Sequence, residues 1–304
     1  LGKLRTYMVH PEPFKLNYIE IGNEQWGEAY IERYKVFDKA IKTKYPEMII
    51  ISGSGPFPDG EYFEYGWDEL KKMNIDVIDE HYYRPPQWFR DNAGRYDSYD
   101  RNGPKVFAGE YAAHPKKVED GPKENNWEAA LSEAAFMTGL ERNADVVTLT
   151  SYAPLMAHID AFQWAPDMIW FNNLESYGTA NYYVQKLYGN NPGTDLLTIT
   201  ENGKSLTGQH SLYASAVKDV KTNELIIKVV NISEEKQTII VTPQGVSLNG
   251  KGTITTLRND DLSASNSFDN PQNIGLLATD FEIKEGKIEI ELSGQSMNVI
   301  KVKI

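Results

Sequence analysis

The chain has 304 residues, of which 40% are hydrophobic and 24% are charged, and its formal net charge is -12. This length predicts one large and one small domain, and the acidic balance argues against a nucleic-acid partner, because binding a phosphate backbone needs clustered Lys and Arg. The absence of cysteine excludes disulfides and thiolate chemistry, and no apolar run in the sequence is long enough to span a membrane.

The first part of the chain alternates between apolar segments and helical patterns. Pro11 and Pro13 follow the end of a short helix and indicate a stiff connector. The apolar segments predict five strands, the first of them buried in a parallel sheet, at 16–22, 48–53, 75–83, 105–111 and 145–152. Helices are expected near 30–41, 61–73, 127–143 and 177–188, and the segment 84–104 is expected to be a long functional loop.

Five strand and helix units are too few to close an eight-stranded barrel. The α/β part is therefore expected to be either a smaller open sheet or the later part of a barrel whose first three units lie upstream of Leu1.

The hydrophobic period changes after the turn signal Gly-Asn-Asn-Pro-Gly at 189–193. Beyond it, alternating residues predict strands at 225–230, 237–241, 287–292 and 297–302. We expect an α/β domain over residues 1–190 and an all-β domain, an antiparallel β-sandwich, over residues 191–304.

Two glutamates follow apolar strands and form the candidate catalytic site. Glu24 follows the first strand, and Glu110 ends the fourth. The carboxyl ends of parallel strands meet at one edge of an α/β fold, so both side chains are expected there. Glycosidic cleavage needs such a pair, one carboxyl to give a proton and one carboxylate to face the anomeric carbon. Taken alone, a glutamate in the position of Glu24 is more often a helix cap.

His81 and Tyr83 end the strand that lies between the two glutamates in sequence, and alternation places both on one face. They can hold the charge state of the nucleophile and orient a sugar, or they can be ordinary packed hydrogen-bonding residues. The remaining histidines show no metal-ligand spacing, and there is no phosphate loop or dinucleotide fingerprint. No metal and no cofactor are therefore expected.

Several ordered motifs between residues 10 and 190 strongly resemble the α-L-arabinofuranosidases of glycoside hydrolase family 51. They are His-Pro-Glu-Pro-Phe at 10–14, Tyr-Ile-Glu-Ile-Gly-Asn-Glu-Gln-Trp-Gly at 18–27, Asp-Glu-His-Tyr-Tyr at 79–83, Phe-Ala-Gly-Glu-Tyr at 107–111, Ser-Tyr-Ala-Pro-Leu at 151–155 and Trp-Ala-Pro-Asp-Met-Ile-Trp-Phe-Asn at 164–172.

The resemblance implies a retaining enzyme built as a (β/α)8 TIM barrel followed by a β-sandwich. It implies that residues 1–190 hold barrel strands four to eight and that strands one to three are absent from the chain. Glu24 is then the general acid/base and Glu110 the nucleophile. The same resemblance implies four substrate-binding residues, which are Asn23, His81, Tyr83 and Gln163.

The implied activity is release of terminal α-L-arabinofuranosyl residues, and the implied partner is an arabinose-containing oligo- or polysaccharide. A glycosidase of another specificity, such as an endo-glucanase, and a non-catalytic carbohydrate-binding or structural fragment remain open. A homo-oligomer is a further expectation, because an incomplete barrel exposes strand edges. The sequence leaves the compartment open between a periplasmic or secreted and a cytoplasmic location.

Overall fold

The computed structural model describes residues 2–115 and 125–304. The chain divides into two compact units, one made of Leu1–His81 with Asn102–Phe107 and the other of Tyr82–Arg101 with Ala108–Ile304. Two strands, β3 (Val77–Arg84) and β4 (Lys105–Ala113), contribute residues to both units.

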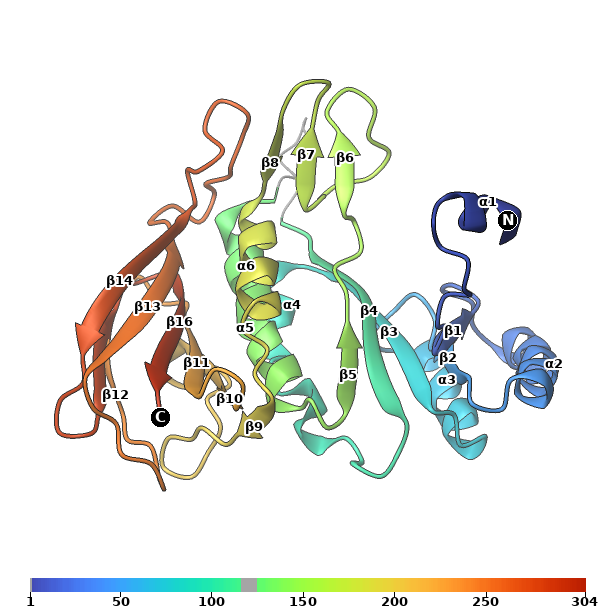
Figure 1. Ribbon diagram of the computed structural model, residues 1–304, viewed down its shortest axis with the longest axis horizontal. Helices are drawn as coiled ribbons and strands as arrows, with labels where there is room; N and C mark the ends of the chain where they lie inside the picture. Colours follow the sequence, from blue (N-terminus) through green and yellow to red (C-terminus); the bar gives the residue numbers. More distant parts are fainter. Residues whose placement is uncertain (1, 116–124) are drawn as a thin grey trace. The chain divides into compact units, whose positions relative to one another are not determined.

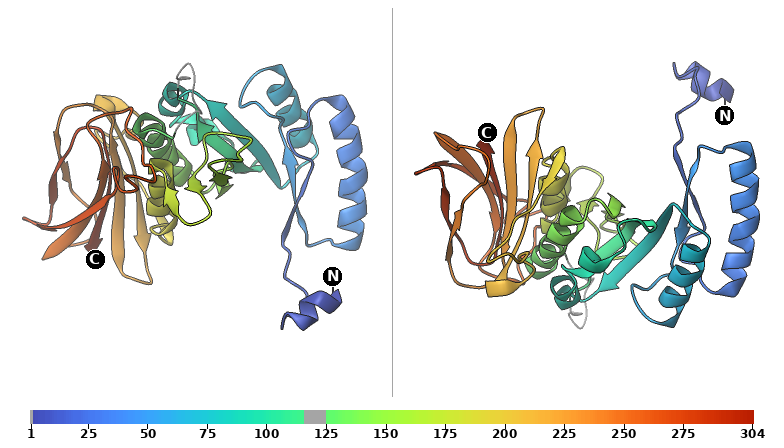
Figure 2. Two further views of the ribbon diagram at one scale, coloured as in Figure 1. Left: turned by 90° about the horizontal axis from the view of Figure 1, so that it is seen from above. Right: turned by 90° about the horizontal axis from the view of Figure 1, so that it is seen from below.

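The first unit is a parallel α/β unit. Its further elements are α1 (Gly2–Tyr7), β1 (Tyr18–Ile21), α2 (Glu28–Lys44), β2 (Ile49–Gly53) and α3 (Glu61–Lys72). Tyr18 of β1 pairs with Ile49 of β2, and Ile51 of β2 pairs with Val77 of β3, both in parallel register. Helix α2, in blue, runs beside β1 in both views of Figure 2. The core of the unit is a cluster of buried aromatic and aliphatic side chains from both helices and the strands: Tyr30, Ile31, Tyr34, Ile50, Leu70, Ile75 and Ile78.

Two features of this unit depart from the prediction. The first strand was expected to be buried, yet Tyr18 is exposed and the next three residues of β1 are only partly buried. Phe37, which has helical spacing with Tyr34, is also exposed. The described chain pairs β1 with β2 alone, so one side of this strand lies open.

The second unit begins with the later residues of β3 and β4, which lie side by side where His114 donates a backbone hydrogen bond to Arg84. Next to β4 lies β5 (Val147–Thr150), since Ser151 N donates to Ala108 O over 2.9 Å. The segment predicted as a structureless loop contains α4 (Pro86–Asp91) and the short 3-10 helix η1 (Arg95–Ser98). That prediction was wrong because each helix is too brief to show a hydrophobic period.

Two longer helices complete the α/β part of this unit. Asn126 caps α5 (Trp127–Arg142) by accepting from Ala129 N, and Thr179 caps α6 (Ala180–Gly189) by accepting from Tyr182 N. Between α5 and α6 in the sequence, three short strands form a sheet: β6 (Met156–His158), β7 (Ile169–Phe171) and β8 (Ser176–Gly178). This sheet was not predicted, because strands of three residues are too short to show alternation.

The all-β part is a sandwich of a six-stranded and a two-stranded sheet. The first has the order β14-β13-β16-β11-β10-β9, and the second pairs β12 with β15. The bounds are β9 (Asp195–Leu197), β10 (Leu212–Asp219), β11 (Glu224–Asn231), β12 (Gln237–Val241), β13 (Lys251–Arg258), β14 (Leu276–Glu282), β15 (Ile288–Leu292) and β16 (Ser296–Lys303), with the 3-10 turn η2 (Gln209–Ser211) before β10.

The predicted strands in this part are confirmed as β11, β12, β15 and β16, and all described strand pairs of both sheets are antiparallel. The prediction missed β9, β10, β13 and β14, because β10 is rich in Ala and Ser and β13 begins within an apparent turn at Lys251 and Gly252. One apolar cluster joins both sheets, with Ile227 and Ile300 from one and Ile288 and Leu292 from the other. An α/β part followed by an antiparallel all-β part is therefore confirmed.

Helix α5 packs against the sandwich. Figure 1 shows α5 and α6 side by side, with β10 and β11 next to α5. Trp127, fully buried, donates its indole N–H to Gln295 O over 3.0 Å. At the other end of the helix, the buried ammonium of Lys228 on β11 forms an ion pair with Glu141 and donates to Asn191 O over 2.6 Å.

Candidate active site

The turn after β1 fixes the backbone of Glu24. Gly22 has φ 95° and Glu24 has φ 59°, so the chain turns twice through the left-handed region. A side chain at Gly22 would collide with the side-chain oxygen of Gln25, which accepts from Asn23 N–H. Helix α2 begins only at Glu28, with Gly27 as its N-cap and no side-chain cap. Glu24 is therefore not a helix cap.

Glu24 belongs to a row of three hydrogen-bonded groups in the first unit. His81 lies 2.9 Å from Glu24 Oε1 through Nδ1 and 2.6 Å from Asp79 Oδ2 through Nε2. Asp79 and His81 are each 2% exposed, whereas the side chain of Glu24 is 34% exposed. The row thus connects a buried carboxylate to one that solvent or substrate can reach.

The row requires a proton on its outer pair. A neutral imidazole has one donor and one acceptor nitrogen, so it cannot donate to two carboxylates at once. Either His81 is an imidazolium, or it is neutral and one of the two carboxyl groups, Glu24 or Asp79, carries the second proton. In each of these states one proton lies between Glu24 and His81. A hydrogen-bonded row that shares a proton in this way is suited to proton handling.

Glu110 has its own partner in the second unit. It lies on β4 between Gly109 and the fully buried Tyr111, and the phenol of Tyr83 donates to its Oε2 over 2.7 Å. Tyr83 and His81 lie two residues apart on β3, as the predicted alternation requires. A phenolic hydrogen bond stabilises the ionised carboxylate that a nucleophile needs.

Aromatic side chains surround Tyr83. Its ring centroid lies 5.4 Å from that of His114 and 5.6 Å from that of Trp164. Trp164 is 48% exposed, so part of its indole is accessible to solvent. Gln163 precedes it and is exposed, as is Asn23 in the first unit. The structure thus puts Tyr83 against Glu110 and His81 against Glu24, and it leaves Gln163 and Asn23 at the surface.

The sequence analysis missed two buried carboxyl groups near these residues. Asp79 could have been found, since it shares the alternating face of His81 and Tyr83. Glu133 on α5 is fully buried and accepts from Ala113 N and Asn181 Nδ2, each over 2.7 Å. Burial raises the pKa of Glu133 to about 8. The sequence feature that could have indicated Glu133 is a single charged residue within Ala-Leu-Ser-Glu-Ala-Ala-Phe. This stretch is otherwise apolar on every face of the helix.

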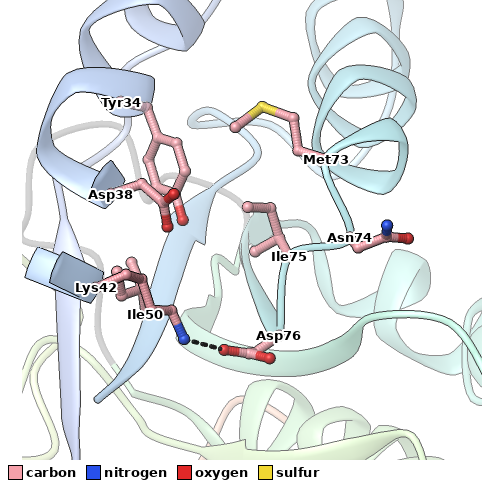
Figure 3. Close-up of a pocket in the computed structure, with 8 residues that line it drawn as sticks. All are labelled: Tyr34, Asp38, Lys42, Ile50, Met73, Asn74, Ile75 and Asp76. Atoms are coloured by element: carbon pink, nitrogen blue, oxygen red, sulfur yellow. Dashed lines mark hydrogen bonds and ion pairs between the residues drawn. The ribbon is translucent and has the colours of Figure 1, made fainter. Parts of the chain in front are cut away.

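The first unit also contains a cavity of about 160 Å³ at the amino ends of β2 and β3 (Figure 3). It is lined by Tyr34, Asp38, Lys42, Ile50, Met73, Asn74, Ile75 and Asp76. Catalytic groups of α/β folds lie at the carboxyl ends of the strands, so this cavity lies at the wrong end to serve Glu24. Its Lys42 and Asp76 form an ion pair of 3.0 Å.

Two family models match the chain. The model of the α-L-arabinofuranosidase C-terminal domain matches residues 109–296, and that of the α-L-arabinofuranosidase 1 domain matches residues 1–101. The chain belongs to the α-L-arabinofuranosidases of glycoside hydrolase family 51. The resemblance read from the sequence is thereby confirmed.

Curated relatives carry the same name. The chain is 51% identical over 193 residues to an extracellular exo-α-L-arabinofuranosidase of Streptomyces chartreusis, an alignment that covers 63% of the chain and 22% of that protein. It is 33% identical to α-L-arabinofuranosidase 2 of Arabidopsis thaliana, over 100% of the chain and 44% of the plant protein. The chain thus spans less than half the length of these two relatives.

Solved structures of the family share the fold. An arabinose-bound MgGH51 α-L-arabinofuranosidase superimposes with a TM-score of 0.85 at 30% identity, covering 99% of the chain and 47% of that structure. The arabinose complex of the Thermotoga maritima α-L-arabinofuranosidase gives 0.76 at 21% identity, covering 100% and 69%, and shows the fold alone. None of the helices in the described ranges combines the length and the hydropathy that crossing a bilayer requires.

Proposed function

We propose that this chain carries the catalytic pair of a retaining α-L-arabinofuranosidase, with residues 1–190 as strands four to eight of a (β/α)8 barrel and residues 191–304 as its C-terminal sandwich. The observation that supports it best is that each glutamate has a partner fitted to its role: Tyr83 donates to Glu110, and His81 shares a proton with Glu24.

Glu110 is the nucleophile. Its carboxylate attacks the anomeric carbon of a terminal arabinofuranosyl residue and forms an ester bond as the bond to the leaving oxygen breaks. The hydrogen bond from Tyr83 orients the carboxylate through one of its oxygens.

Glu24 is the general acid and then the general base. It gives its proton to the leaving oxygen, and afterwards it takes a proton from the water that attacks the anomeric carbon and displaces Glu110. His81, held by Asp79, stabilises Glu24 in both protonation states because it can accept from the acid or donate to the carboxylate. Glu24 gives up one proton and takes up one proton in each cycle, so the enzyme returns to its starting state.

Asn23 and Gln163 serve the sugar. Both are exposed, and both lie beside residues already assigned, Asn23 before Glu24 and Gln163 before Trp164. A primary amide can donate to and accept from a sugar hydroxyl at the same time. We assign Asn23 to binding the 2-hydroxyl of the sugar and Gln163 to contacting the sugar ring. The proposed substrate is an arabinose-containing oligo- or polysaccharide, from which the enzyme releases terminal residues.

Arabinose release from an aryl α-L-arabinofuranoside tests the proposal. The assay compares the chain, a longer protein carrying the upstream region that its relatives have, and Glu110→Gln in each. Glu28→Gln, an exposed glutamate four residues from Glu24, is the matched control. We expect release that Glu110→Gln abolishes and Glu28→Gln preserves, with the first product formed in the retained configuration.

Each other result has a definite meaning. Activity in the longer protein alone makes this chain a part of the enzyme that is not active by itself. Release of glucose from cellulose oligosaccharides in place of arabinose transfers the assignment to a glucanase. Sugar binding without turnover in folded protein identifies a non-catalytic module, and a product of inverted configuration overturns the role given to Glu110.

A further inference from the structure

A buried carboxyl lies behind the strand that carries Glu110. Glu133 is 0% exposed, and its Oε1 accepts the backbone N–H of Ala113 over 2.7 Å. Ala113 is the last residue of β4, three positions after Glu110. This bond pairs the backbone N–H at the end of β4 with a side chain of α5, so it attaches the strand end to the helix.

The second oxygen of Glu133 reaches a different element. Its Oε2 accepts from Asn181 Nδ2 over 2.7 Å, at the start of α6. Asn125 lies 3.3 Å from Asn181 and donates to the phenol of Tyr152 over 3.0 Å, just after β5. One side chain of α5 is therefore hydrogen-bonded to the end of β4 and to the start of α6, and Asn181 and Asn125 extend the contact to the end of β5.

We propose that Glu133 is a positioning residue for the reaction: as a neutral acid it ties the end of β4 to α6 and so fixes the place of the Glu110 carboxylate. The inference rests on the proposed function, in which Glu110 attacks the anomeric carbon. A displacement of about 1 Å in such a group can cost about 100-fold in rate.

The surroundings favour the neutral form. Both hydrogen-bond partners of Glu133 are uncharged, and a buried carboxylate without a cation is costly. The pKa of Glu133 rises to about 8 because burial outweighs the bonds from Ala113 and Asn181. A half-turn of the Asn181 and Asn125 amides lets the acid proton be donated to Asn181, and Asn181 in turn donate to Asn125.

The groups that face Glu133 add no positive charge. Tyr111 comes from β4 and Tyr152 from the segment after β5, and burial raises the pKa of both phenols. Asp167, whose pKa burial raises to about 6, acts on Tyr152. Asn181 and Gln185 on α6 are neutral, and within residues 2–115 and 125–304 no Lys, Arg or His contributes to the pKa of Glu133.

The sign of the pH dependence follows from these pKa values. The pKa of Glu133 in the folded protein, about 8, lies above its ordinary value of 4.5. The stability that the bound proton provides is complete below the unfolded pKa and is lost as the pH rises through the folded pKa. Ionisation of Glu133 above about 8 therefore weakens the end of β4.

The test compares Glu133→Gln with Glu133→Leu, and uses Glu128→Gln on the same helix as the matched control. Glutamine reproduces a neutral acid with one donor side and one acceptor, while leucine leaves Ala113 N–H unpaired. The substrate is an aryl arabinofuranoside with a good leaving group, whose departure needs little acid help from Glu24. We expect Glu133→Gln to keep kcat within about threefold, and Glu133→Leu to lower kcat by about 10- to 100-fold with KM nearly unchanged.

Two further readouts separate this role from a merely structural one. We expect the parent to lose activity as the pH rises through about 8, and Glu133→Gln to lack this loss. Infrared spectra at neutral pH should show a protonated-carboxyl band that Glu133→Gln removes. A normal kcat in Glu133→Leu, or an ionised Glu133 at neutral pH, overturns the proposal. If no protein turns over arabinofuranoside, the proposed function and the positioning role both fail, while the infrared band still decides the charge state.

Discussion

Helices α2 and α5 each follow a strand that leads to a proposed catalytic glutamate, but they are built differently. Helix α2 buries only Tyr30, Ile31 and Tyr34 along 17 residues. Helix α5 buries 13 of its 16 residues, including the polar side chains of Ser132, Glu133 and Thr138. The first packs one face on a sheet, and the second is enclosed by α4, α6 and the sandwich.

The difference shows two ways of holding a carboxylate in place. Glu24 is held at a partly exposed position by one hydrogen-bonded row that ends on the buried Asp79. Glu110 stands on a strand whose neighbours Ala108 and Tyr111 are fully buried and whose end is bonded to a buried helix. The proposed acid/base must exchange protons with water, whereas the proposed nucleophile must keep its position, and each arrangement suits its proposed task.

The largest expected effect separates the two carboxylates. Glu110→Gln should lower kcat by more than about 1,000-fold for every substrate, because no nucleophile remains. Glu24→Gln should lower it by about 100- to 10,000-fold for a poor leaving group and by far less for a good one, since only the first needs a proton. Steady-state rates across a series of aryl arabinofuranosides measure the contrast. Equal losses in both variants for all leaving groups would contradict the division of roles.

Because α5 is enclosed by its neighbours, we expect a large loss of stability when the ion pair near its carboxyl end is broken. Lys228 is 0% exposed, and it forms an ion pair with Glu141. Lys228→Met leaves that carboxylate, which is only 12% exposed, without its cation and should lower the free energy of unfolding by about 3 kcal/mol. Denaturant unfolding followed by far-UV circular dichroism measures it.

A compensating variant provides the control for this pair. Lys228→Met combined with Glu141→Leu removes both charges and should recover most of the loss, because a buried ion pair replaced by apolar groups is often neutral. A double variant as unstable as the single one would show that Lys228 acts through Asn191 and the ring of Tyr188 instead.

The hydrogen-bonded row that holds Glu24 predicts a smaller effect on activity. Asp79→Asn replaces the carboxylate that faces Nε2 of His81 with an amide that can either accept or donate, so the tautomer facing Glu24 is no longer fixed. We expect kcat/KM to fall by roughly tenfold or somewhat more with a poor leaving group. Asp68→Asn on the exposed face of α3 is the control. An unchanged kcat/KM in Asp79→Asn would show that the row does not serve the proton.

The sequence predicted those parts of the site that lie within one strand. Alternation along β3 placed His81 and Tyr83 on one face, and strand ends marked Glu24 and Glu110. It did not reveal which partner each would take, since His81–Glu24 and Tyr83–Glu110 are contacts between elements. Glu133 was missed for the same reason: a helix side chain bonded to a strand end produces no period in the sequence.

The smallest expected effect is at the cavity of Figure 3, where Lys42 and Asp76 form an ion pair with side chains 38% and 49% exposed. Solvent screens such a pair, so its coupling free energy should be below about 1 kcal/mol. A double-mutant cycle of Lys42→Met and Asp76→Asn, followed by thermal unfolding, measures it. Lys42 also donates to Met48 O over 2.9 Å, and this bond remains in Asp76→Asn but is lost in Lys42→Met. The lysine variant should therefore be the more destabilising of the two. A coupling free energy between Lys42 and Asp76 as large as that expected for Lys228 and Glu141 would show that exposure does not govern the strength of ion pairs in this chain.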